Sequence, residues 1–149
     1  MFNLDKFDIR NAQSWVNMPE LGKGARIRVK PATEANPNWY NEMLALATER
    51  QAAATGQVTG EDVARNRDQD VQTYPRFVIT GWENLKADPE GEPSGIDEDG
   101  NVIFNRGACA KLCALMAAKA PHLFDRIRDH ASSPSKFYPK DEVLPPDGD

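Results

Sequence analysis

Two cysteines are the first residues whose type and spacing could do chemistry. Cys109 and Cys113 stand four residues apart, so a helix would place both thiols on one face, where they could ligate a metal ion. The chain has no other cysteine, and the nearest histidine, His122, follows a proline that breaks the helix. Because cysteine is among the most frequently buried residue types, the spacing favours core packing over a metal site.

The two histidines, His122 and His130, stand eight residues apart, too far for one helical turn to bring them together. An activated nucleophile needs its base within hydrogen-bond reach, and the chain has no nucleophile motif of the Gly-x-Ser-x-Gly kind. His130 is expected near the end of a helix, where the helix dipole favours a cation. A capping role therefore explains His130 better than a catalytic one.

Asp97, Asp99 and Asn101 alternate like the oxygen ligands of a calcium loop. An EF-hand loop counted from Asp97 would need glycine at its sixth position and glutamate at its twelfth, but Val102 and Ala108 stand there. The pattern favours a solvated Asp-Gly turn. We therefore expect no metal, no cofactor and no enzymatic activity; the weaker alternative is a small hydrolase or metal-dependent enzyme built on the two histidines and this loop.

The charge and composition of the chain limit the kinds of partner that it can bind. Its 149 residues carry 18 basic and 23 acidic side chains, a net charge of −5, which argues against a general binder of nucleic acid or of acidic membranes. One face of a strand carries three basic residues, Arg26, Arg28 and Lys30, which could contact phosphate. Such charges more commonly lie on a strand face that is exposed to solvent. No apolar run approaches the roughly 20 residues that span a bilayer, no signal peptide is recognisable, and two cysteines give no disulfide framework. The composition predicts a soluble intracellular protein.

The hydrophobic spacing predicts the elements that position these residues. Ala25, Ile27 and Val29 alternate with basic residues, which indicates a half-buried strand over residues 25–30. Asn105 is placed to cap a helix that buries Cys109, Leu112, Cys113, Leu115 and Met116. The remaining expected elements are a helix over 36–54, a short, mostly polar and weakly held helix over 59–70, strands over 76–82 and 102–104, a solvated loop over 88–100, and helices over 106–119 and from 121 onward. For residues 76–82 a helix is the alternative, because the period of a short apolar run is ambiguous.

These elements predict an α+β fold. Residues 25–131 would form a small, mainly helical domain with a few short antiparallel strands. An extended N-terminal arm, residues 1–24, would precede it, with Trp15 and Val16 as its points of contact. A Pro-rich acidic tail, residues 132–149, would follow, docking loosely or remaining disordered.

The order of these pieces resembles the phage tail assembly chaperone family of the siphophage type. The resemblance covers about two thirds of the chain. It is carried by five segments in order: Arg26-Ile27-Arg28-Val29-Lys30-Pro31, Asn36-Pro37-Asn38-Trp39-Tyr40-Asn41-Glu42-Met43-Leu44, Phe77-Val78-Ile79-Thr80-Gly81-Trp82-Glu83-Asn84-Leu85, Asp99-Gly100-Asn101-Val102-Ile103-Phe104-Asn105 and Pro121-His122-Leu123-Phe124-Asp125-Arg126-Ile127.

This resemblance implies a non-enzymatic protein of the host cytoplasm that binds the tape-measure protein and recruits tail-tube subunits during tail assembly. Such a chaperone needs an accessible apolar groove, which Trp39, Tyr40, Phe77 and Trp82 could line; alternatively, these aromatic residues are simply the core. Homo-oligomers are compatible with this role, whereas nucleic-acid and membrane partners are not expected. A competing hypothesis is a structural virion component, such as a tail or head-completion protein, whose arms would become ordered against neighbouring subunits.

Overall fold

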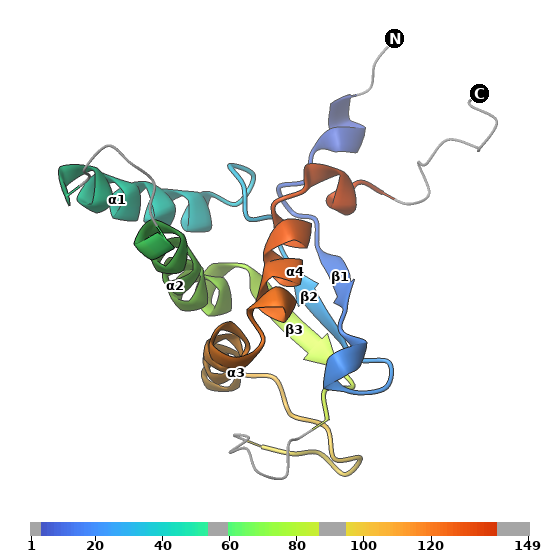
Figure 1. Ribbon diagram of the computed structural model, residues 1–149. Coiled ribbons are helices and arrows are strands. Elements are labelled where there is room, and N and C mark those ends of the chain that lie inside the picture. Colours follow the sequence, from blue (N-terminus) through green and yellow to red (C-terminus); the bar gives the residue numbers. More distant parts are fainter. Residues whose placement is uncertain (1–3, 54–59, 87–94, 140–149) are drawn as a thin grey trace.

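Three antiparallel strands form the sheet on which the fold is built (Figure 1). The computed structural model describes residues 4–53, 60–86 and 95–139. In it, β2 (Arg26–Val29) lies between β1 (Ser14–Asn17) and β3 (Ile79–Glu83). The predicted strand over 25–30 is confirmed, because Ile27 and Val29 are fully buried on one side while Arg26 and Arg28 point to the other. Ile27 is paired with Val16 of β1 and with Trp82 of β3, which places these three side chains on the inner face.

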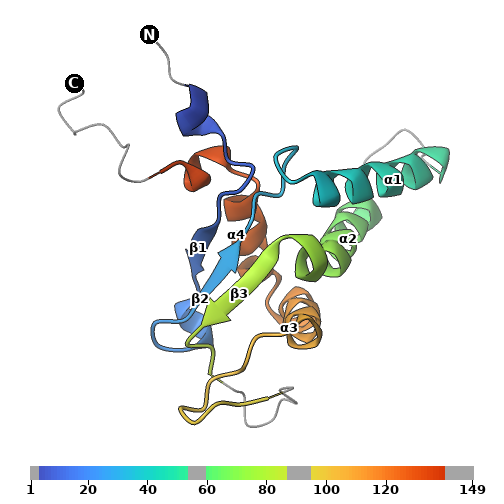
Figure 2. The same cartoon turned by 180° about the vertical axis from the view of Figure 1, so that it is seen from behind.

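Helices cover only the inner face of this sheet. The four described helices are α1 (Pro37–Ala53), α2 (Gly60–Phe77), α3 (Arg106–Lys119) and α4 (Pro121–Ala131). Of these, α2 packs on β3 and α3, while α4 packs on α3 and β1; the opposite face, seen in Figure 2, carries none of them. α1 packs chiefly on α2 and projects from the sheet together with it (Figure 1). The fold is therefore α+β, as predicted.

The core lies between the sheet and α2, α3 and α4. Phe124 and Ile127 of α4 are fully buried, and the ring of Phe124 contacts that of Tyr74 of α2 edge to face, with 5.6 Å between centroids. Cys109 and Cys113 are free thiols with no exposed surface, so the prediction that they pack in the core is confirmed. The predicted burial of Leu115 is wrong, since 49% of its surface is exposed on the outer side of α3.

Side chains cap two helices where the sequence places them. The Asn105 side chain accepts a hydrogen bond from the amide of Ala108 at the start of α3, over 2.8 Å. The Asn36 side chain caps α1 more loosely, accepting from the amide of Trp39 over 3.5 Å, while its amide group donates to the Phe77 carbonyl over 2.8 Å. Asn36 therefore also joins the start of α1 to the end of α2.

The expected N-terminal arm is wrong for residues 14–18, which belong to the folded domain, but the expected contact of Val16 with the core is confirmed. Residues 14–17 form the edge strand β1, and Val16 and Met18 are buried. Their two-residue spacing is a strand signal, but a polar stretch precedes it and Pro19 cuts it short, so it is too brief to stand out. Short 3₁₀ turns, Leu4–Phe7 and Pro19–Leu21, lie on either side.

The boundary between α2 and β3 also differs from the prediction. α2 runs to Phe77, past the expected end near residue 70, and the strand starts at Ile79 rather than at residue 76. Pro75 stands in the last turn of α2, where it lacks the N–H that would donate to the carbonyl of Val71. The end of α2 is not weakly held, because Asp70, Thr73 and Tyr74 are buried.

Two further expectations need correction. Residues 102–104 form no strand; Val102 makes only an isolated bridge, to Ile96. In the expected tail, Pro134–Phe137 form a 3₁₀ turn, and Phe137 is buried against the core. Residues 88–94 of the expected acidic loop and residues 140–149 of the tail lie outside the described residues.

Candidate functional site

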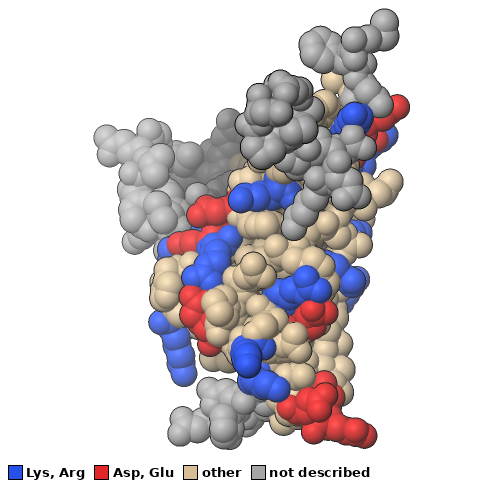
Figure 3. Space-filling model, turned by 90° about the vertical axis from the view of Figure 1, so that its right-hand side faces the viewer, with Lys and Arg blue, Asp and Glu red and all other residues tan. Residues whose placement is uncertain are grey.

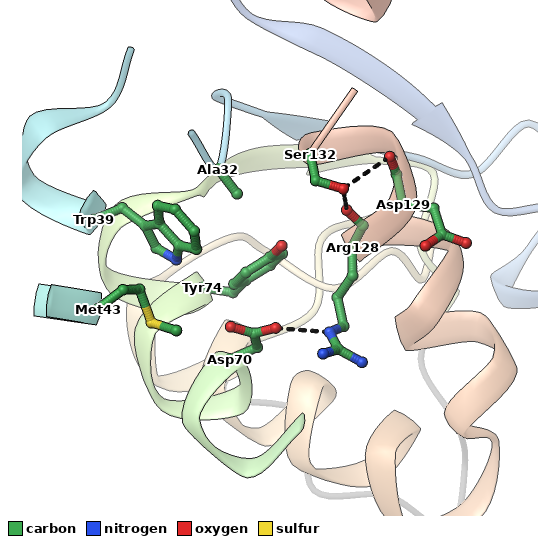
Figure 4. A pocket seen from close by; sticks show the side chains of 8 residues that line it. All are labelled: Ala32, Trp39, Met43, Asp70, Tyr74, Arg128, Asp129 and Ser132. Carbon is green, nitrogen blue, oxygen red and sulfur yellow. Dashed lines mark hydrogen bonds and ion pairs between the residues drawn. The ribbon is translucent and has the colours of Figure 1, made fainter. Parts of the chain in front are cut away.

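A pocket of about 360 Å³ lies where α1, α2 and α4 meet (Figure 4). Trp39 and Met43, one helical turn apart on α1, form one wall. Asp70 and Tyr74, likewise one turn apart on α2, form the floor. The remaining lining residues are Ala32, Arg128, Asp129 and Ser132.

The Trp39 indole is held in this wall by the way α1 begins. Asn36 fixes the first turn of α1 against the Phe77 carbonyl, and Trp39 follows within that turn. The indole nitrogen Nε1 is buried and has no hydrogen-bond partner among the described residues. An indole N–H that is removed from water normally finds an acceptor, so this nitrogen is an unsatisfied donor enclosed by the protein.

An ion pair joins Asp70 on the floor of the pocket to Arg128 on the side opposite Trp39. Arg128 donates from Nε to Asp70 Oδ2 over 2.7 Å and from its Nη1 atom to Asp125 Oδ1 over 2.8 Å. Partial burial would lower the pKa of Arg128, but the hydrogen bonds to the two carboxylates outweigh it and raise that pKa. Arg128 is therefore a cation whose charge is already compensated within the protein.

Tyr74 adds a neutral hydroxyl to the floor of the pocket. Burial raises the pKa of its phenol well above the usual range, and the nearby carboxylate of Asp70 raises it further. The Ser132 hydroxyl donates to the Arg128 carbonyl over 2.8 Å. The pocket therefore combines aromatic and thioether surface with one compensated ion pair, which suits binding better than bond-making chemistry.

Of the four aromatic residues expected to bind a partner, only Trp39 lines this pocket. Tyr40 is half-buried on α1, and Phe77 packs partly into the core with the Arg76 guanidinium 4.7 Å from its ring centroid. Trp82 lies in β3, where its indole donates to the Val102 carbonyl over 2.8 Å and its ring meets that of Phe104. The structure does not gather the four residues in this pocket, and three of them pack against the core.

The sequence prediction missed Asp70, Tyr74 and Arg128. The local signal was that Tyr74 follows Asp70 by four residues, a spacing that places both on one face of a helix. The Asp70–Arg128 pair spans 58 residues, so nothing in the sequence near either residue indicates the other.

A second, more open cleft of about 680 Å³ lies between β1 and α4 and contains both histidines. His130 Nε2 lies 2.8 Å from the Ser14 hydroxyl, a contact between residues 116 positions apart, and the His130 ring meets Phe137 edge to face. The side chain of His130 therefore tethers β1 to α4. The predicted capping role rested on its position alone, and that position, the last turn of α4, is confirmed.

The polar side chains of the expected Asp-Gly turn and of β2 interact with residues close to them. One Asp97 oxygen accepts from the amides of Asp99 and Asn101, as in a solvated turn, and the described residues contain no cluster of three potential metal ligands. On β2, the Arg26 guanidinium stacks 3.9 Å from the Trp15 ring centroid and pairs with Glu83.

Arg28 of the same strand donates to the Thr80 hydroxyl over 3.0 Å. Figure 3, which faces the side of the molecule where β1 lies, shows basic side chains next to acidic ones rather than one broad basic region.

None of the described helices combines the length with the apolar character needed to cross a lipid bilayer. In comparisons with protein-family models, with curated proteins and with solved structures, nothing matches the chain.

Proposed function

We propose that this chain is a phage tail assembly chaperone, a non-enzymatic protein that binds the tape-measure protein and recruits tail-tube subunits in the host cytoplasm. The observation that carries the proposal is the ordered set of five segments in the sequence. In the fold, these segments are β2, the first turns of α1, the end of α2 with β3, the turn that leads into α3, and α4. The order of the motifs is therefore an order of consecutive structural elements.

The pocket lends this proposal secondary support. A chaperone of a long, partly apolar helical client needs a pocket that accepts apolar side chains next to polar groups. Trp39, Met43 and Tyr74 provide the apolar surface, and the Asp70–Arg128 pair lies beside them.

Co-expression with the tape-measure protein of the same phage tests the proposal. We expect the two proteins to elute together as a soluble complex in size-exclusion chromatography, and the tape-measure protein alone to be insoluble. A small acidic protein of unrelated fold, co-expressed in the same way, controls for solubilisation by charge alone. Insoluble tape-measure protein with no co-eluting complex would refute the proposal.

Mass spectrometry of purified particles distinguishes the chaperone from a structural virion component. A chaperone acts before the particle is complete, so we expect it to be absent or far below one copy per tail-tube subunit. Stoichiometric copies in finished particles would favour the structural component instead.

A further inference from the structure

β1 is an edge strand that pairs on one side only. The strand order is β1-β2-β3, so β1 forms one end of the described sheet (Figure 2). The Met18 amide donates to the Ala25 carbonyl over 2.9 Å, and the residues of an antiparallel pair bond to the neighbouring strand alternately. Val16, two residues before Met18, therefore bonds to β2, whereas the main-chain N–H and C=O groups of Trp15 and Asn17 point away from β2.

A contact from α4 supports this direction. Arg126 reaches the Asn17 carbonyl from outside the sheet, over 3.4 Å. A carbonyl oxygen has two lone pairs, so this long bond leaves the oxygen able to accept from a closer donor. The main chain of Trp15 makes no hydrogen bond of this kind with the described residues. The open cleft between β1 and α4, which both residues line, gives access to this edge.

β1 lacks the features that commonly keep two sheet edges apart, which are charged side chains, proline and bulges. The other edge strand, β3, has two of these features. It is bulged at Thr80, where the register with β2 shifts, and it ends at the charged Glu83. β1 has no charged residue and no proline, and its register with β2 is regular. Of the two edges, β1 is therefore the one that can accept another strand.

This edge is complementary to itself. Trp15 and Asn17 lie symmetrically on either side of Val16, so a two-fold axis at Val16 places Trp15 of one copy opposite Asn17 of the other. Each of these two pairs exchanges two N–H···O=C bonds, which makes four bonds in all. A second copy of β1 therefore engages every outward main-chain group of both residues, and the two strands match in length.

The charges on α4 are complementary in the same arrangement. α4 runs antiparallel to β1, because Arg126 contacts Asn17 and His130 contacts Ser14. The axis that places Asn17 opposite Trp15 thus places Arg126 level with Asp129 of the second copy. Asp129 lines the cleft, and its carboxylate has no ion-pair partner within residues 4–53, 60–86 and 95–139. Opposite charges therefore face each other twice, which favours this register over a parallel one.

We infer that β1 pairs antiparallel with β1 of a second copy of this chain, with the two-fold axis at Val16. Three strands from each copy then form one continuous sheet, and α4 of both copies lies on the same face of it. The inference does not depend on the proposed function, because it uses only main-chain groups and charges of the described residues.

Nuclear magnetic resonance of an equal mixture of ¹³C-labelled and unlabelled protein tests the register directly. In the inferred pairing, Val16 faces Val16 of the second copy without hydrogen bonds between them, and the Cα atoms of such a pair lie about 4.5 Å apart. We expect an isotope-filtered nuclear Overhauser effect between the α-protons of the two Val16 residues. A dimer without this signal would overturn the inference.

Sedimentation equilibrium between about 10 μM and 1 mM protein measures the dissociation constant of the dimer. Asn17→Pro removes an outward N–H without removing a bond to β2. It should raise the dissociation constant about thirtyfold, because the symmetry removes the same bond twice. Asn17→Ala keeps the N–H and is the matched control with an unchanged constant. Thermal unfolding of both variants checks that the fold is intact.

Each outcome decides the inference. A chain that stays monomeric throughout this range, or a dimer that a folded Asn17→Pro variant does not weaken, overturns it. If Asn17→Pro does not fold, the signal between the Val16 α-protons decides. A monomer whose Trp15 and Asn17 amide signals shift with a tape-measure peptide would place a client strand on β1 and overturn the second copy. The inferred dimer without any tape-measure complex would keep this inference and refute the chaperone.

Discussion

The guanidinium of Arg128 lies against the carboxylate of Asp70, with 2.7 Å between Nε and Oδ2, and so joins the last helix to α2. Only 11% of the Asp70 side chain and 25% of the Arg128 side chain are exposed. This pair closes one side of the candidate pocket, so the stability of the pocket and that of the fold depend on the same contact.

Replacing Asp70 should therefore destabilise the fold. Asp70→Asn keeps the size of the side chain but leaves Arg128 without its closest carboxylate, and we expect the free energy of unfolding to fall by about 2 kcal/mol in urea denaturation. Asp8→Asn is the matched control, because the Asp8–Arg10 pair is exposed and such pairs contribute little. Equal changes in the two variants would contradict the role of the Asp70–Arg128 contact.

The pair between Glu20 and Arg126 predicts a pH dependence. Both terminal nitrogens of Arg126 donate to the Glu20 carboxylate, over 2.7 and 2.6 Å, and these hydrogen bonds lower the pKa of Glu20 from 4.5 to about 2. A carboxyl with a depressed pKa in the folded state stabilises the fold above its unfolded pKa of 4.5, and this stabilisation is lost as pH falls towards 2.

Urea denaturation at several pH values checks this dependence. The stability difference between the wild type and Glu20→Gln should be constant above pH 4.5 and should vanish near pH 2. Arg126→Met should remove the same pH-dependent contribution, and the double variant should lose nothing more of it. Because the pair is at the surface, added salt should reduce the contribution at every pH. A difference that persists unchanged at pH 2 would contradict the assignment to Glu20.

The hydrogen bond that Asn36 donates to Phe77 should stabilise the fold more than the cap that Asn36 provides for α1. Asn36→Asp keeps the oxygen that caps α1 but cannot donate to the Phe77 carbonyl, and leaving that carbonyl unpaired should cost about 2 kcal/mol. Asn105→Asp makes the same change at the start of α3, where the capping oxygen alone bonds within the part of the chain that the structure describes, and should leave the thermal midpoint unchanged or slightly raised. Similar midpoints for the two variants would show that the bond to Phe77 contributes little.

The two thiols should be unreactive in the native protein. A hydrogen bond with Cys109, together with burial, raises the pKa of Cys113, and the thiolate is the form that reacts. Ellman's reagent should therefore label neither cysteine in native buffer and both in denaturant. A Ser135→Cys variant, exposed on the surface, should react at once and confirms that the reagent is active. Rapid labelling of the native wild type would mean that α3 opens readily from the core.

The elements that the sequence predicted well are those with a strong local signal. β2 alternates over its whole length, α3 has an asparagine cap and α4 starts at a proline and buries Leu123, Phe124 and Ile127 as its spacing indicates. β1 was missed because its inward-facing signal amounts to Val16 and Met18, and the strand depends on its pairing with β2. The end of α2 was misplaced because Pro75 is typical of a boundary, whereas here tertiary packing of Tyr74 on Phe124 extends the helix past it.

The candidate site was predictable only in part. Trp39 was selected as an aromatic residue near a helix start, and it does line the pocket. The polar side could not be found in the same way, because Asp70 and Arg128 meet only when α2 and α4 pack together. Whether an indole nitrogen has an acceptor depends on the same packing, so the difference between Trp39 and Trp82 became visible only in three dimensions.

The tether between Ser14 and His130 has a consequence for synthesis on the ribosome. β1 emerges early, yet the helix that packs against it is among the last described elements to leave the exit tunnel. Until α4 has emerged, the buried side chains of the sheet have no cover on that side, and the nascent chain presents apolar surface to chaperones and proteases. Chains truncated before residue 131 should therefore be degraded faster than chains that include α4, which makes the emergence of α4 the step that protects the sheet.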